Sequence, residues 1–129
     1  MRSSNYSKLH PMFIERWSPR SFLSDPIHND TLNCLFEAAR WSPSCFNEQP
    51  WLFVYANNKE DLARFQSVLV ESNQVWANMA PVLAFAFSKR VFSHNDKPNR
   101  WAEFDTGAAW MSLTMQANQL GLVTHAMGG

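Results

Sequence analysis

The sequence has few cysteines, few glycines and no excess of either charge. It contains two cysteines, four glycines, and eleven basic residues that balance eleven acidic ones. Cys34 and Cys45 form no CxxC motif and cannot build a disulfide framework, which favours a reducing, cytoplasmic location. A chain without net charge also has no electrostatic footprint for nucleic acid or anionic lipid.

Long apolar runs and metal-ligand spacings are also missing. The longest apolar run covers residues 79–87, whereas a helix needs about twenty residues to span a bilayer. The N-terminal residues contain no apolar segment of the kind that marks a secretory signal. The histidines are widely spaced and no HExxH motif occurs, so a zinc site has little support. We therefore expect no membrane, nucleic-acid or metal partner.

What the sequence does contain indicates one packed domain. It has 129 residues, of which 46% are hydrophobic, 14% aromatic and 17% charged. This length is that of a single domain, and a disordered chain would show the opposite balance of apolar and charged residues.

Hydrophobic spacing and turn residues predict alternating helices and strands. Leu32, Leu35, Phe36 and Ala39 repeat at the spacing of one helical face, and Asn29 or Asp30 is expected to cap that helix. Helices are predicted over residues 11–17, 29–41, 58–72 and 101–120, buried strands over 51–56, 82–87 and 122–126, and a polar loop over 89–100. Residues 101–120 are apolar nearly all round, which is typical of a buried helix. Gly121 occupies the position of a C′ glycine. This order predicts an α/β or α+β fold.

A first candidate site lies in residues 16–20, Arg-Trp-Ser-Pro-Arg. The proline predicts a bend at the end of a helix, because it forces its predecessor out of the α region. A bend would let Arg16, Ser18 and Arg20 converge, and guanidinium groups donate paired hydrogen bonds to phosphate oxygens. A solvated basic turn is the alternative, and the short motif alone favours it.

A second candidate site is the polar segment 43–51, Pro-Ser-Cys-Phe-Asn-Glu-Gln-Pro-Trp. It separates an amphipathic helix from an apolar strand. Asn47 and Gln49 carry amides that both donate and accept hydrogen bonds, which suits a ligand with alternating carbonyls and ring nitrogens. The alternative is turn chemistry that ends a helix and starts a strand.

A third candidate site is the end of the sequence, residues 120–129. Gly128 and Gly129 follow the third predicted strand, and paired glycines let a backbone approach a ligand closely. A plain turn is the alternative reading.

Taken in order, these segments resemble the nitroreductase family of FMN-dependent NAD(P)H oxidoreductases. The resemblance rests on RWSPR, on PSCFNEQPW after the second helix, on NMAPVLAFAF, and on a GAA-containing helix that ends in GL before GG. It runs from about residue 14 to residue 129, and PSCFNEQPW is its most specific part. It implies an α+β fold with a mixed central sheet flanked by helices, and a homodimer with flavin at its interface.

The resemblance also implies which residues bind FMN. Arg16, Ser18 and Arg20 match positions that contact the phosphate and ribityl chain, and Trp17 matches one that lies against the flavin. Pro43, Ser44, Cys45 and Asn47 match the loop that faces the partner subunit's flavin, where Gln49 orients the loop. Asn73 matches a residue near the isoalloxazine edge, and Gly128 and Gly129 match a turn beside the reactive edge. No catalytic side chain is expected, because the flavin carries the chemistry.

One departure from the family pattern concerns the end of the sequence. Members of the family usually continue past the glycine turn with a helix, a further strand and a basic residue that helps to hold the phosphate. We therefore expect residues 1–129 to form a single nitroreductase-like domain that is incomplete after this turn.

The function implied is transfer of hydride from NAD(P)H through FMN to an electron-poor acceptor, such as a nitroaromatic or a quinone, in a ping-pong cycle. Two alternatives stay open at this point. The chain could be a non-catalytic flavin-binding or dimerisation remnant, or a member of the same family that remodels flavin.

Overall fold

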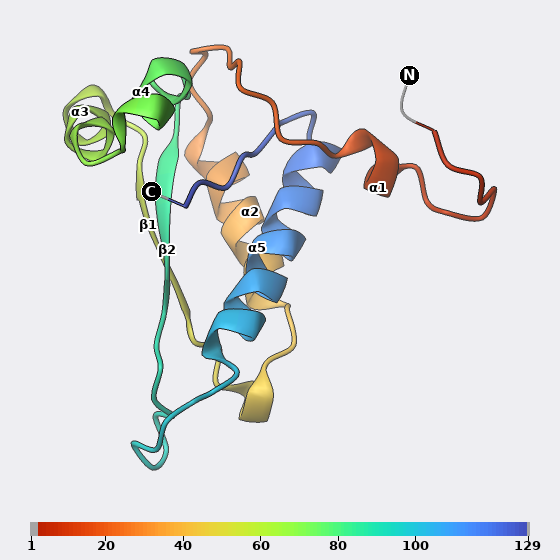
Figure 1. Cartoon of the computed structure of the whole chain (residues 1–129), viewed down its shortest axis with the longest axis vertical. Helices are drawn as coiled ribbons and strands as arrows, with labels where there is room; N and C mark the ends of the chain where they lie inside the picture. Colours follow the sequence, from red (N-terminus) through yellow and green to blue (C-terminus); the bar gives the residue numbers. More distant parts are fainter. Residues whose placement is uncertain (1–2, 129) are drawn as a thin grey trace.

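The computed structural model describes residues 3–128 and has an α+β fold, which confirms the expected fold class (Figure 1). Within these residues the helices are α1 (Met12–Glu15), α2 (Asn29–Arg40), the 3₁₀ helix η1 (Cys45–Asn47), α3 (Lys59–Ser67), α4 (Glu71–Ala77) and α5 (Ala102–Gln119), and the strands are β1 (Trp51–Ala56) and β2 (Leu83–Ser88).

The sheet in the described residues consists of β1 and β2, paired antiparallel. β1 has the predicted bounds, and β2 lies one residue further along than predicted. Helices α3 and α4 form the connection between the strands at one end of the sheet (Figure 1). The resemblance implied a mixed sheet, whereas the pairing in residues 3–128 is antiparallel throughout.

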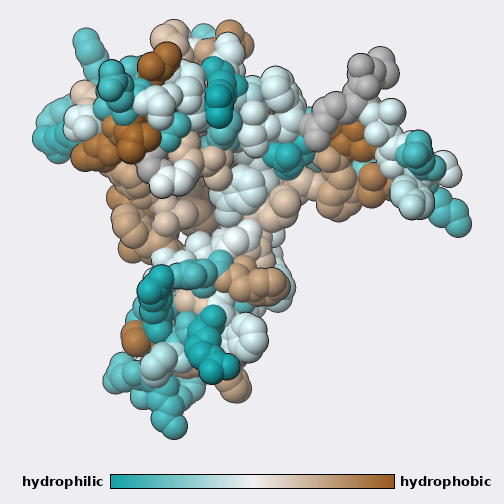
Figure 2. Space-filling view, viewed as in Figure 1, coloured by the Kyte–Doolittle hydropathy of each residue, from teal (hydrophilic) through white to brown (hydrophobic). Residues whose placement is uncertain are grey.

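The two faces of the sheet have different surroundings. Phe53 and Tyr55 lie 5.8 and 5.0 Å from the ring of Phe36 on α2, so this face packs against the helices. On the opposite face, Leu52 is 59% and Phe87 51% exposed. The prediction of two buried strands is therefore wrong, because α2 and α5 pack against one face and leave Tyr55 partly exposed, whereas α3 covers only part of the other face. Figure 2 shows apolar surface in the region of the sheet and hydrophilic surface on the loop below it.

Helices α2 and α5 pack side by side against the inner face of the sheet (Figure 1). Leu32, Leu35 and Ala117 form the buried cluster between them. A second buried cluster, which includes Leu69 and Leu83, joins α4 to β2. An apolar cleft of about 380 Å³ lies between the sheet and these helices.

The third predicted strand, residues 122–126, is not a strand in the structure. Its polar groups bond elsewhere: the Leu122 N–H donates to the Ala117 carbonyl at 2.9 Å, and the Thr124 hydroxyl bonds to Thr114. This segment therefore follows α5 without pairing with β1 or β2, and its His125 contacts the carbonyl of residue 19.

Three helix predictions need correction. The predicted helix 58–72 is two helices, because the chain turns between α3 and α4 and buries Leu69 in the core. The predicted helix 11–17 shrinks to the four residues of α1. The N-cap of α2 is His28, since the Asn29 side chain instead accepts a hydrogen bond from Asn57 at 3.0 Å.

Helix α5 is buried on one side only. Phe104 is 77% and Met111 43% exposed, so the prediction of a fully buried helix is wrong. Gly121 has φ +74°, which confirms the predicted C′ glycine. In the described part of the chain, no helix is long and apolar enough to cross a membrane.

Candidate functional site

Residues 16–20 form a bend directly after α1, as predicted. Arg16 is the C-cap residue of α1 and has extended backbone angles, so the chain leaves the helix there. The Arg16 guanidinium donates to the Ser18 hydroxyl at 3.4 Å, which places these two polar groups side by side. Pro19 is buried and anchors the bend, whereas the Trp17 side chain is 52% exposed.

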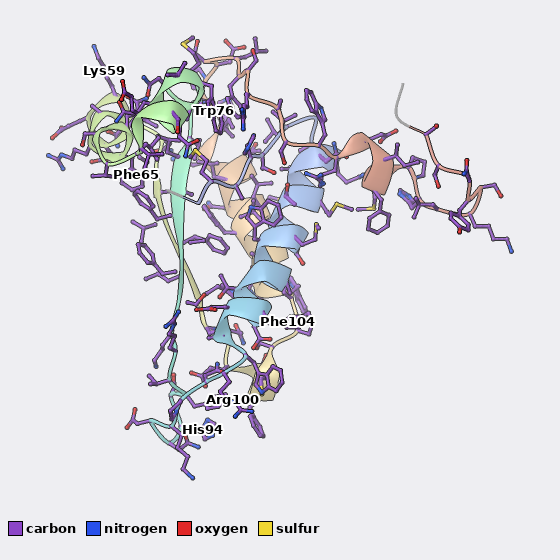
Figure 3. The ribbon with its side chains drawn as sticks, viewed as in Figure 1. Lys59, Phe65, Trp76, His94, Arg100 and Phe104 are labelled. Atoms are coloured by element: carbon purple, nitrogen blue, oxygen red, sulfur yellow. The ribbon has the colours of Figure 1, made fainter. Side chains whose placement is uncertain are left out.

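Trp76 of α4 is the centre of the contacts around this bend (Figure 3). The Arg20 guanidinium carbon lies 5.8 Å from the Trp76 ring centroid, within the range of a cation–π contact. The rings of Phe22 and His125 lie 6.1 and 4.4 Å from the same ring. The bend, α4 and the chain after α5 therefore meet at one place.

His125 joins the segment after α5 to the bend at residues 16–20. Its ring Nδ1 lies 2.8 Å from the Pro19 carbonyl oxygen. A carbonyl oxygen only accepts, so Nδ1 must carry the proton, which leaves Nε2 as the acceptor in the neutral ring. This bond holds the bend against the segment that leads to Gly128.

Two further predicted residues lie in the same region. Asn73 is half-buried on α4, one turn before Trp76. Gly128 follows Met127, which packs against the same core cluster as Trp76. Gly129 lies outside the described residues.

The loop 43–47 is held by helix α5. The buried Ser42 hydroxyl lies 2.7 Å from the Ser112 hydroxyl. Three residues later, the Cys45 N–H donates to Asp105 Oδ2 at 3.0 Å. These contacts join residues 60 and 70 positions apart in the sequence.

The same loop has unusual backbone angles. Phe46 and Asn47 have φ 54° and Gln49 has φ 51°, all in the left-handed region that non-glycine residues rarely adopt. The Ser44 hydroxyl accepts from the Gln49 N–H at 2.9 Å, and Asn47 Oδ1 accepts from Gln49 Nε2 at 3.1 Å. Gln49 thus orients the loop from within. Strained backbone of this kind clusters at binding and active sites.

The two candidate regions lie at opposite ends of α5 (Figure 1). The loop 43–47 contacts the first turns of the helix, whereas residues 16–20 contact the segment that follows its last turn. An 18-residue helix is about 27 Å long. One chain therefore does not bring the loop to the bend.

Glu48 joins the loop to residues 89–100. Its side chain is 6% exposed, and one carboxylate oxygen accepts from the Ser93 hydroxyl and N–H at 2.6 and 2.7 Å. Donation by the Ser93 hydroxyl is the main cause that lowers the pKa of Glu48. Burial opposes it as the next largest effect, and the Ser93 N–H, Lys89 and His94 lower the pKa further. The ring of Phe46, 81% exposed, meets Phe92 edge-on at 5.7 Å.

Asp105, Trp76 and His125 were not predicted as site residues. Asp105 carries a visible signal, since it is an acidic residue in a helix that is otherwise largely apolar. His125 lies within a predicted segment but was considered only as a metal ligand. Trp76 carries no such signal, because an aromatic residue on a helix is more often part of the core.

Comparison with known proteins agrees with these features. The sequence profile of the nitroreductase family matches residues 14–77. A protein of Streptomyces coelicolor, provisionally named NADH dehydrogenase/NAD(P)H nitroreductase, is 32% identical over 84 residues, which cover 64% of this chain and 42% of that protein. A protein of Burkholderia lata with the same provisional name is 25% identical over 139 aligned positions, covering 99% of this chain and 71% of that protein.

The fold is also similar to solved structures. A crystal structure described as an oxidoreductase containing FMN superimposes with a TM-score of 0.92 and 45% sequence identity. The match covers 99% of this chain and 66% of that one. This chain therefore spans about two thirds of that structure and a smaller share of the Streptomyces protein. Motifs, fold and relatives agree: the chain belongs to the nitroreductase family.

Proposed function

We propose that this chain belongs to an FMN-dependent oxidoreductase that passes hydride from NAD(P)H through the flavin to an electron-poor acceptor, such as a nitroaromatic or a quinone, in a ping-pong cycle. The observation that carries the proposal is the meeting of residues 16–20, α4 and residues 122–128 around Trp76 and His125.

The groups in this region fit the phosphate end of FMN. Arg16 and Ser18 lie side by side, and Arg20 forms no ion pair with a carboxylate among residues 3–128. An uncompensated guanidinium favours an anionic ligand, and arginine binds phosphate oxygens with two parallel hydrogen bonds.

Each predicted residue of this region would contact a different part of FMN. Arg16, Ser18 and Arg20 would hold the phosphate and ribityl chain, Trp17 would lie against the ring system, and Asn73 and Gly128 would present polar groups to its edge. When bound, FMN supplies the redox chemistry itself. The protein's part is then to bind, to orient and to exclude water.

The loop 43–47 would serve a second subunit. It is pre-organised by α5, yet it lies at the far end of that helix from residues 16–20 (Figure 3). A homodimer would let Pro43, Ser44, Cys45 and Asn47 face the flavin of the partner subunit. Exposed apolar side chains at this end, including Phe46 and Phe104 at 81% and 77%, suit burial in such an interface.

Steady-state turnover tests the proposal. With FMN present, NAD(P)H oxidation should depend on a nitroaromatic or quinone acceptor, and double-reciprocal plots at several acceptor concentrations should be parallel. Arg20→Ala should weaken FMN binding about tenfold or more, because a charge-assisted contact is lost. Arg64→Ala on α3 is the matched control, since Arg64 is 70% exposed and its ion pairs among residues 3–128 are with Glu60 and Asp61 of the same helix. Flavin binding without turnover would instead support the non-catalytic alternative.

A further inference from the structure

Asp105 is a buried carboxylate at the start of α5. It is 4% exposed, and its Oδ2 accepts a hydrogen bond from the Cys45 N–H at 3.0 Å. Acidic side chains are almost never fully buried unless they are paired, because removing a charge from water is unfavourable. The Cys45 N–H is the partner that the described residues give it.

This hydrogen bond acts on the strained part of the loop. Cys45 directly precedes Phe46 and Asn47, whose φ angles of 54° lie in the left-handed region. Such a conformation persists only when the surrounding contacts determine it. The bond to Asp105 fixes the backbone immediately before these residues, and the hydrogen bond from the Gln49 N–H to the Ser44 hydroxyl closes the loop around them.

We propose that Asp105 is a positioning residue for the flavin. It holds the Cys45 backbone, and through it the loop 43–47, in the conformation that faces the cofactor. This proposal rests on the proposed function, since the loop's role as a flavin contact comes from there. Asp105 acts through the loop and does not itself touch the cofactor.

Two substitutions separate positioning from simple structural support. Asp105→Ala removes the acceptor and leaves the Cys45 N–H unpaired. Asp105→Asn keeps an oxygen acceptor of similar shape and removes a buried charge. Asp105→Asn should therefore keep the fold with a smaller loss of stability than Asp105→Ala, whereas its hydrogen bond becomes weaker, because bonds to charged acceptors are about twice as strong as neutral ones.

The test combines flavin affinity with amide exchange in the full chain. We expect the Kd for FMN to rise roughly tenfold in Asp105→Ala and about threefold in Asp105→Asn, from loss or weakening of one charge-assisted hydrogen bond. Hydrogen–deuterium exchange should become faster in residues 43–49 of Asp105→Ala and stay unchanged in α2. Glu103→Ala is the matched control. It removes a carboxylate from the same turn of α5, and the Glu103 side chain is 67% exposed.

The outcomes are distinguishable. Wild-type FMN affinity in both Asp105 variants, with FMN bound by the wild type, would overturn the role of Asp105 and leave the proposed function intact. Equal losses in Asp105→Ala and Glu103→Ala would also overturn it. A wild-type chain that binds no FMN would overturn the proposed function and with it this role, even if exchange in the loop responds. If Asp105→Ala does not fold, Asp105→Asn alone decides: a raised Kd for FMN in the folded variant supports the role of Asp105, and a wild-type Kd overturns it.

Discussion

In the proposed function, side chains at the candidate site have two roles: some would offer groups to a ligand, and others hold the backbone beside them. Arg16, Ser18 and Arg20 would have the first role. His125 and Asp105 have the second, since each bonds to a backbone group of a segment distant in the sequence. Substitution of a residue with the first role should weaken flavin binding directly. Substitution of a residue with the second role should disturb local order, and flavin binding only as a result.

His125→Phe tests the bond to the bend. Phenylalanine keeps a ring against Trp76 and loses the hydrogen bond to the Pro19 carbonyl. We expect the free energy of unfolding to fall by about 1 kcal/mol, the usual net value of such a bond. Urea unfolding measures the change, and His28→Phe on the exposed N-cap of α2 serves as control. Equal stability of His125→Phe and wild type would show that the bond contributes nothing.

Glu48 should make stability depend on pH. Its pKa is lowered in the folded chain, so its charged form stabilises the fold; this contribution is complete above the ordinary value of 4.5 and is lost as pH falls through the lowered pKa. Glu48→Gln should therefore be less stable than wild type at pH 7, and the difference should shrink towards about pH 3. Urea unfolding at both pH values checks this, with Glu60→Gln, whose side chain is 76% exposed, as control. A difference that is constant with pH would contradict the cause assigned to this shift.

At the scale of helices and strands, the sequence predicted those elements that depend on neighbouring residues. Apolar spacing and the following proline predicted the span of α2, the apolar run predicted the bounds of β1, and the glycine at the end of α5 predicted where that helix stops. Residues 122–126 have the composition of a strand, but a strand forms only beside a partner, and their polar groups bond to α5 and residue 19 instead. Periodicity alone could not give this result.

The same limit applies to the candidate site. The bend at residues 16–20 and the polar loop were predictable, since proline and amide residues act on their neighbours. The contacts that complete the site join positions 60 and 106 residues apart, and no pattern in a single sequence pairs Cys45 with Asp105 or Pro19 with His125.

Two glycines, one inside α5 and one just after it, should change the stability of the fold in opposite directions when each is replaced by alanine. Gly121 has φ +74° and open space around it, so Gly121→Ala meets only the backbone penalty of about 1 kcal/mol. Gly107 lies inside the helix, also with open space, so Gly107→Ala should stabilise the fold by about 0.5–1 kcal/mol through helix propensity. Thermal unfolding of both variants tests this pair, and changes of the same sign would contradict the assigned backbone roles.

At the scale of the whole molecule, the separation of the two candidate regions along α5 has a direct consequence. If each flavin lies between residues 16–20 of one subunit and the loop 43–47 of the other, a site needs one intact region from each chain. Two defective chains can then restore a site that neither forms alone.

Mixed dimers test this arrangement. Arg20→Ala and Ser44→Pro, each weak in flavin binding by itself, should regain about a quarter of the wild-type flavin content when they are unfolded together and refolded, since half of the randomly formed dimers are mixed and each holds one intact site. Flavin absorbance per chain is the measurement. Mixtures that bind no more flavin than the separate variants would place both regions of each site on the same chain.

The proposed function requires that residues 16–20, α4 and residues 122–128 assemble a site for FMN. The visible absorbance spectrum of the purified chain, taken with FMN and then after anaerobic addition of NADPH or NADH, shows whether they do. We expect a protein-bound flavin spectrum that bleaches on addition of the nicotinamide and returns with a quinone. A chain that holds no flavin even in excess FMN would mean that these segments form no FMN site.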